Sequence, residues 1–145
     1  MSGNQVLGLD LSRVVKAKPG AVFDAFTKSD EMKKWWGPEG MTCPNADIDL
    51  RPGGAWETLM QAPDGTTRDV RGTFTDIEPG KKLAYTWAWY TDGKPGAESK
   101  VALEFAEKDG GTEVRLHHDG FVTQDECTQH QMGWASSLNC LEQIF

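Results

Sequence analysis

The sequence contains few cysteines, and none of them forms a Cys-x-x-Cys pair. The three present are Cys43, Cys127 and Cys140. The last two fall in one expected helix, where they would lie roughly 20 Å apart, which is too far for a disulfide. We therefore expect free thiols in a reducing compartment, and a cytoplasmic protein.

Long apolar runs are also missing. No segment approaches the roughly 20 apolar residues that a membrane span needs. Asp10 interrupts the apolar stretch near the start of the chain, which argues against a secretory signal. The sequence thus predicts a protein with no membrane partner.

Positive charge is in deficit, with 15 Lys and Arg against 22 Asp and Glu, for a net charge of −7. Such a chain repels phosphate backbones and anionic bilayers, so we expect no nucleic-acid partner. Nucleotide-binding glycine loops and Gly-x-Ser-x-Gly nucleophile turns are absent.

Metal-ligand spacings are absent as well. His117 and His118 are neighbours on an expected strand, so they point to opposite faces and cannot chelate one ion. His130 stands alone on an expected helix. We predict no metal and no cofactor.

What the chain does have is enough apolar material for one core, and many aromatic rings. It is 145 residues long, 38% hydrophobic and 26% charged, which fits a single folded domain over residues 1–145. Six Trp and six Phe are present. Such large rings fill cores, and they also line apolar pockets.

Apolar periodicity indicates the secondary structure. Alternation predicts a first strand that starts near Gln5 and runs to about Ala17. Two short helices follow, one after Pro19 and one from Ser29 to the Trp35-Trp36 pair, where Gly37-Pro38 stops it. Further alternating segments predict six strands, at 46–51, 56–61, 70–74, 83–89, 101–105 and 113–118.

A longer helix closes the chain, from about Asp125 to Phe145. Its apolar stripe is Trp134, Leu138, Leu141 and Phe145. One antiparallel sheet covered by helices is the simplest way to bury all these faces, which predicts an α+β fold.

A series of short motifs resembles a known family. They are Val22-Phe23-Asp24-Ala25-Phe26-Thr27, Trp35-Trp36-Gly37-Pro38, Asp49-Leu50-Arg51-Pro52-Gly53-Gly54-Ala55-Trp56, Pro63-Asp64-Gly65, Gly72-x-Phe74, Ile77-x-Pro79, Leu83-x-Tyr85-Thr86-Trp87, Leu116-x-His118-x-Gly120-Phe121 and Gly133-Trp134-x-x-x-Leu138. In this order, over about Val6 to Phe145, they resemble the START-like SRPBCC superfamily. Within it the chain is most similar to the family named for the activator of heat-shock protein 90 ATPase.

The resemblance implies a helix-grip fold, in which a curved antiparallel sheet wraps around the long C-terminal helix. Two short helices after the first strand would partly cover a cavity between sheet and helix. Relatives use that cavity for lipids, polyketides, hormones or other apolar molecules. Eukaryotic activators carry a further N-terminal domain, for which a first strand starting near Gln5 leaves no room, so we do not expect chaperone activation.

The candidate ligand-binding residues are those whose rings or thioethers could line such a cavity. They are Trp35, Trp36, Trp56, Met60, Phe74, Tyr85, Trp87, Trp89, His118, Phe121, Met132 and Trp134. Packing against one another is the alternative for each. Tyr85, Trp87 and Trp89 share one face of a strand and form the expected concave wall.

Polar candidates are fewer. His118 shares a face with Val114 and Leu116, so it could orient a substrate or act as a general acid or base, or be a buried neutral imidazole. Asp47, Asp49 and Glu57 oppose the apolar stripes, so they are solvated groups of the outer face or, as paired carboxylates, groups for acid–base work. Arg51 could hold a ligand carboxylate at the cavity mouth or form a surface ion pair.

The sequence favours a binding protein for a small hydrophobic or aromatic molecule over an enzyme. Two alternatives stay open. One is a cyclase, aromatase or hydrolase that uses the same cavity, with His118 as the weak catalytic candidate. The other is a chaperone-linked or stress-response regulator, and a weak homodimer is compatible with either.

Overall fold

The computed structural model describes residues 7–145, so the predicted strand start near Gln5 lies outside the described residues. The elements are β1 (Leu7–Val15), α1 (Pro19–Thr27), α2 (Ser29–Met32), β2 (Thr42–Ile48), β3 (Ala55–Gln61), β4 (Thr67–Glu78), β5 (Lys82–Thr91), β6 (Lys94–Pro95), β7 (Ser99–Lys108), β8 (Gly111–Phe121) and α3 (Gln124–Gln143). No helix among these residues has the length and apolar character needed to cross a membrane.

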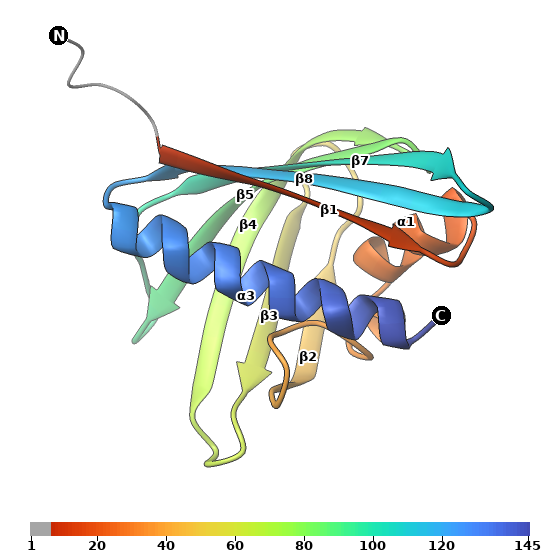
Figure 1. Ribbon diagram of the computed structural model, residues 1–145. Coiled ribbons are helices and arrows are strands. Elements are labelled where there is room, and N and C mark those ends of the chain that lie inside the picture. Colours follow the sequence, from red (N-terminus) through yellow and green to blue (C-terminus); the bar gives the residue numbers. More distant parts are fainter. Residues whose placement is uncertain (1–6) are drawn as a thin grey trace, which may run out of the picture.

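The eight strands form one sheet in the order β1-β8-β7-β5-β4-β3-β2, with β6 paired to β5. Every pairing is antiparallel. The sheet curves around α3, and α1 lies near the end of the sheet where α3 ends (Figure 1). This confirms the predicted α+β helix-grip fold, with two short helices after the first strand and a long C-terminal helix.

The strands differ from the sequence prediction most clearly at β2 and β6, where local features hide the apolar periodicity. β2 starts at Thr42 and contains Pro44. Its pairing with β3 shifts register between Thr42 and Asn45, on either side of this proline. A proline that cannot donate to the ladder is tolerated there because β2 is an edge strand. The two-residue strand β6 is too short to show any periodicity.

The helix ends also differ. α2 stops at Met32, and the chain continues in tighter turns, with Lys34 N–H donating to Glu31 and Trp35 N–H to Met32. α3 begins after Thr123, whose hydroxyl accepts the Glu126 N–H at 3.2 Å, so it is the N-cap. Phe145 lies beyond the end of α3 and is 41% exposed, so the predicted stripe ends at Leu141.

The end of the interior beneath α1 is packed with rings. Phe105 on β7 contacts both Phe23 and Phe26 edge-to-face, with centroids 5.6 Å apart in each pair. Trp35 packs on Phe26 at 4.7 Å, and its indole N–H donates to the Ala25 carbonyl at 2.9 Å. Trp35 thus fixes the segment after α2 against α1, and Phe105 links α1 to the sheet.

Gly72 on β4 lets the Trp56 indole cross this strand. Trp56 sits on β3, yet its Nε1 donates to the Thr86 carbonyl on β5 at 3.2 Å. A Cβ on Gly72 would overlap both the Thr86 carbonyl oxygen and Trp56 Nε1. The sheet therefore needs a residue without a side chain at this position.

We expect Gly72→Ala to lower the free energy of unfolding by about 3 kcal/mol, because backbone must move to admit the methyl group. Gly20→Ala is the matched control, since nothing lies within 4 Å of a Cβ at that helical position. It should leave stability unchanged or raise it by about 0.5 kcal/mol. Urea unfolding measures both, and equal values for the two variants would contradict this role of Gly72.

Candidate ligand-binding site

A cavity of about 430 Å³ lies between α3 and strands β3 to β5 and is partly open to solvent. Its walls come from β3 to β5, α3 and the loop before β2. The lining residues are Trp36, Pro38, Met41, Met60, Ala62, Thr66, Arg68, Trp87, Trp89, Gln129, His130, Gly133, Trp134 and Ser137.

A larger hollow, of about 590 Å³, lies on the opposite face of the sheet. Its lining includes Asp47, Glu57, Arg71 and Glu98. There Arg71 pairs with Glu57 at 2.9 Å and with Asp69 at 2.8 Å, so its positive charge is already neutralised within the protein. We take the smaller, aromatic cavity as the candidate site, because apolar walls with a few polar groups are typical of ligand pockets.

Tryptophans from the sheet, from α3 and from the segment after α2 form much of the wall of this cavity. Trp87 and Trp89 lie two residues apart on β5, with ring centroids 5.5 Å apart. Trp36 and Trp134 approach Trp87 at 5.9 and 5.4 Å. The Trp36 indole donates to Thr58 Oγ1 at 2.9 Å, which fixes the ring against β3.

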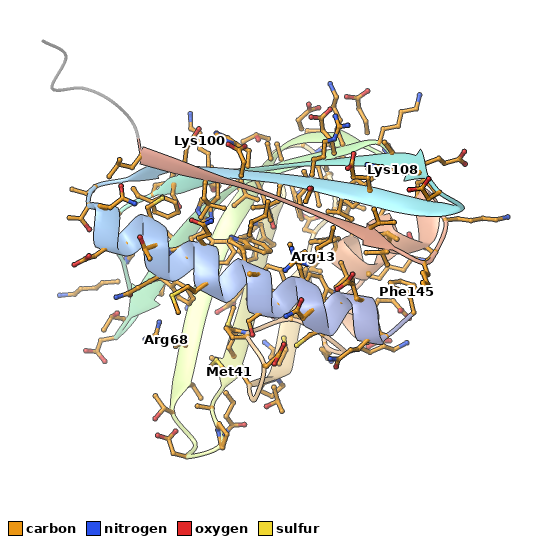
Figure 2. The ribbon with its side chains drawn as sticks, in the orientation of Figure 1. Arg13, Met41, Arg68, Lys100, Lys108 and Phe145 are labelled. Atoms are coloured by element: carbon orange, nitrogen blue, oxygen red, sulfur yellow. The ribbon has the colours of Figure 1, made fainter. Side chains whose placement is uncertain are left out.

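The loop before β2 is held over the cavity by α3. Glu39 N–H donates to Ser136 Oγ at 2.7 Å, and Asn139 donates to the Glu39 carboxylate at 3.1 Å. These bonds hold the lining residues Pro38 and Met41 of this loop near the helix. Figure 2 shows Met41 on the side of α3 where the β3–β4 hairpin projects.

His118 is completely buried, and both of its ring nitrogens are engaged. Nδ1 accepts the Trp134 indole N–H at 3.0 Å, so the proton sits on Nε2. That N–H donates to Ser99 Oγ at 2.7 Å, and Ser99 in turn donates to the Trp87 carbonyl at 3.4 Å. His118 is therefore a neutral imidazole with no nitrogen left for a substrate.

His130 on α3 carries the opposite tautomer. Its Nδ1 lies 2.7 Å from the Glu126 carbonyl, which can only accept, so Nδ1 is protonated. Its Nε2 accepts the Trp89 indole N–H at 2.9 Å. Two Trp–His bonds thus join α3 to the sheet, one from α3 to β8 and one from β5 to α3.

Five of the sequence-predicted residues line the cavity: Trp36, Met60, Trp87, Trp89 and Trp134. Three others, Trp56, Phe74 and Tyr85, instead border a void of only about 10 Å³ beneath α1 and α2. Trp35 is packed in the core, and Phe121 is buried against His118 and His130 at centroid distances of 4.6 and 4.7 Å.

The remaining two residues of the predicted set, Met132 and His118, also lie outside the lining. Met132 is 68% exposed, because it lies on the outer side of α3, whose buried residues are Cys127, Trp134, Ser137, Leu138 and Leu141. His118 is not part of the lining, since Trp134 and Ser99 enclose it. Arg51 is also absent from the lining and pairs with Asp49 at 2.8 Å on the surface.

Sequence reasoning missed Arg68, Met41 and Gly133, all of which line the cavity. Arg68 could have been found, because it continues the alternation through Val70 by two residues, onto the same face of β4. Gly133 was seen only as part of a family motif and Met41 not at all, because which residues line the cavity depends on how the loop before β2 and α3 meet.

Two buried donors have no partner among the described residues, Trp87 Nε1 and Tyr85 Oη. Burial raises the pKa of the Tyr85 hydroxyl far above its usual value, so it remains protonated. A buried donor without a partner lowers the stability of the folded state, so each such atom requires a physical explanation. Trp87 belongs to the cavity wall.

A family model described as "Activator of Hsp90 ATPase homolog 1-like protein" matches residues 16–145. The chain belongs to this family. The resemblance drawn from its motifs is confirmed, and with it the START-like SRPBCC type of fold. No curated protein matches the chain.

Solved structures of similar proteins agree with this assignment. The AHSA1 protein of Silicibacter pomeroyi is 31% identical, with a TM-score of 0.85 over 94% of this chain and 96% of its own. A protein of Chromobacterium violaceum is 25% identical, with a TM-score of 0.85 over 94% and 95%. One from Nitrosomonas europaea is 26% identical, with a TM-score of 0.80 over 94% and 92%.

The two adjacent histidines of β8 respond to pH in opposite ways. Burial lowers the pKa of His118 to about 3, and the nearby His130 and His117 add to this. The hydrogen bond to Asp10, 2.8 Å away, is the main cause that raises the pKa of the half-exposed His117. His118 therefore favours folding at neutral pH, whereas His117 favours it only at lower pH.

Acidification should destabilise the protein through His118. Below pH about 6.5 the unfolded chain binds a proton at this residue that the folded chain does not, so stability falls as pH falls toward 3. Between pH 7 and pH 5 we expect the wild type to lose about 2 kcal/mol more unfolding free energy than His118→Gln.

His117→Asn is the contrasting variant and should lose at least as much unfolding free energy on acidification as the wild type, because it removes a group that binds its proton more tightly in the folded chain. Urea titrations at pH 7 and pH 5 give the change in unfolding free energy for the wild type and for each variant. Equal losses in the wild type and His118→Gln would show that His118 is not held neutral.

Proposed function

We propose that this protein binds a small hydrophobic or aromatic molecule in the cavity between α3 and strands β3 to β5. The observation that carries the proposal is the indole wall of Trp36, Trp87, Trp89 and Trp134 around a volume of about 430 Å³. Rings held by hydrogen bonds and by one another offer a rigid apolar surface, so little conformational entropy is lost when a ligand packs on it.

Packing rather than a polar contact holds Trp87 in the wall, because its Nε1–H is buried and has no hydrogen-bond partner among the described residues. The other five indoles are all paired. Trp35 and Trp56 donate to carbonyls, Trp36 donates to a hydroxyl, and the indoles of Trp89 and Trp134 donate to imidazoles, which fixes their rings.

Binding is favoured over general acid–base catalysis by the state of the histidines. His118 and His130 each have one nitrogen that donates and one that accepts, all within the protein. A general base must reach the proton that it removes, and neither ring offers a free lone pair for this. Both histidines therefore serve to hold tryptophan rings in place, His118 that of Trp134 and His130 that of Trp89.

Filling the cavity from α3 tests this proposal. A Cβ on Gly133 would meet only Pro38 Cγ, at 4.0 Å, so a larger side chain enters the empty space without displacing the core. We expect the wild type to bind N-phenyl-1-naphthylamine, a neutral aromatic probe whose emission rises in apolar surroundings. Gly133→Leu should bind it at least about tenfold more weakly, because the leucine occupies the probe's volume.

Gly133→Ala is the matched control, since it adds one methyl group and improves helix propensity by about 0.5–1 kcal/mol. It should keep the affinity of the wild type. Melting temperatures of both variants, measured alongside, report folding. Unchanged probe binding in a folded Gly133→Leu protein, or no binding by the wild type, would contradict the proposed site.

A further inference from the structure

The charge of the cavity lining points to a narrower class of ligand. We propose, as a deepening of the proposed function, that the molecule bound here carries a carboxylate at one end, which pairs with Arg68. The proposal rests on the same cavity, and it concerns the one cationic side chain at its edge.

Arg68 is placed by β4 and Trp89. It pairs in register with Met60 on β3, and both residues belong to the cavity lining. Its Cζ lies 5.5 Å from the centroid of the Trp89 ring, within the range of a cation–π contact. Since His130 fixes the Trp89 indole from α3, the platform beneath the guanidinium is itself held in place.

The guanidinium has no carboxylate partner within residues 7–145. No ion pair and no side-chain hydrogen bond of Arg68 is formed there, although the chain holds 22 acidic residues. The acidic residues on either side in sequence are engaged elsewhere. Asp64 accepts the Thr66 N–H at 2.8 Å, and Asp69 pairs with Arg71 on the opposite face.

The lining as a whole contains no Asp or Glu, in a protein whose net charge is −7. The hollow on the opposite face of the sheet has three such residues, Asp47, Glu57 and Glu98. At physiological ionic strength the charges more than about 8 Å away are largely screened, so a guest in the cavity responds mainly to Arg68.

These features fit a carboxylate better than a phosphate. Arg68 is the only Lys or Arg in the lining, and it supplies one full positive charge with a fork of N–H donors. A carboxylate matches that charge and geometry in a single bidentate contact, while its apolar body lies along Trp87 and Trp89. A dianionic phosphate would keep an uncompensated charge at the mouth.

Figure 2 shows where the residues of the experiment lie. Arg68 lies on the side of α3 where the β3–β4 hairpin projects, whereas Lys100 on β7 lies on the far side of α3. Lys100 is exposed and forms no ion pair within the described part of the chain. Lys100→Gln therefore removes the same formal charge as Arg68→Gln, away from the cavity.

The test compares 2-naphthoate with 2-naphthamide, which share the ring and differ in charge. Dissociation constants come from the quenching of tryptophan emission at constant ionic strength. We expect the wild type to bind naphthoate about five- to tenfold more tightly than the amide. Arg68→Gln should abolish this preference by weakening naphthoate binding much more than amide binding, and Lys100→Gln should retain it.

Each outcome separates the two proposals. Equal binding of acid and amide by the wild type would overturn the carboxylate assignment, while the cavity itself would still stand. A preference that survives in Arg68→Gln would overturn the role of Arg68. If neither compound nor the neutral naphthylamine probe binds, the proposed function fails, and this inference fails with it.

Discussion

Two hydrogen bonds between tryptophan and histidine determine how α3 sits on the sheet. Trp134 on the helix donates to His118 on β8, and Trp89 on β5 donates to His130 on the helix. Each bond requires a neutral imidazole with its lone pair directed at an indole N–H. Together they hold α3 at a fixed position over the curved sheet. Beneath α1 and α2 the interior is filled with rings, while alongside α3 the space of about 430 Å³ stays open.

Most of the fold could be predicted from the sequence, because apolar alternation and helical stripes record which faces are buried. The long strands and the terminal helix are of this kind. The errors occur where backbone chemistry, rather than the side-chain pattern, determines where an element begins or ends. Pro44 breaks the alternation inside β2, and the turns after Met32 end α2 early without any proline or glycine to mark the place. The two-residue strand β6 exists only because it pairs with β5.

The candidate site could be predicted only in part, because rings that fill a core and rings that line a cavity look alike in a sequence. Trp87 and Trp89 line the open space, whereas Tyr85 on the same face of the same strand borders the packed end. Which of them faces a cavity depends on the distance between α3 and the sheet, and this distance is a tertiary property. Met132 was misplaced for the same reason, since the rotation of α3 turns it to solvent. Arg68 lies at the end of an apolar alternation, where a polar residue does not by itself indicate that the inward-facing pattern continues.

The tautomers of the two histidines give the most direct test of this arrangement. Long-range nitrogen–proton NMR correlations at pH 7 distinguish a protonated Nδ1 from a protonated Nε2 in each imidazole. The structure predicts that His118 carries its proton on Nε2 and His130 on Nδ1, with both rings neutral. The same tautomer in both rings, or a charged imidazole at His118, would mean that α3 is not held to the sheet in this way.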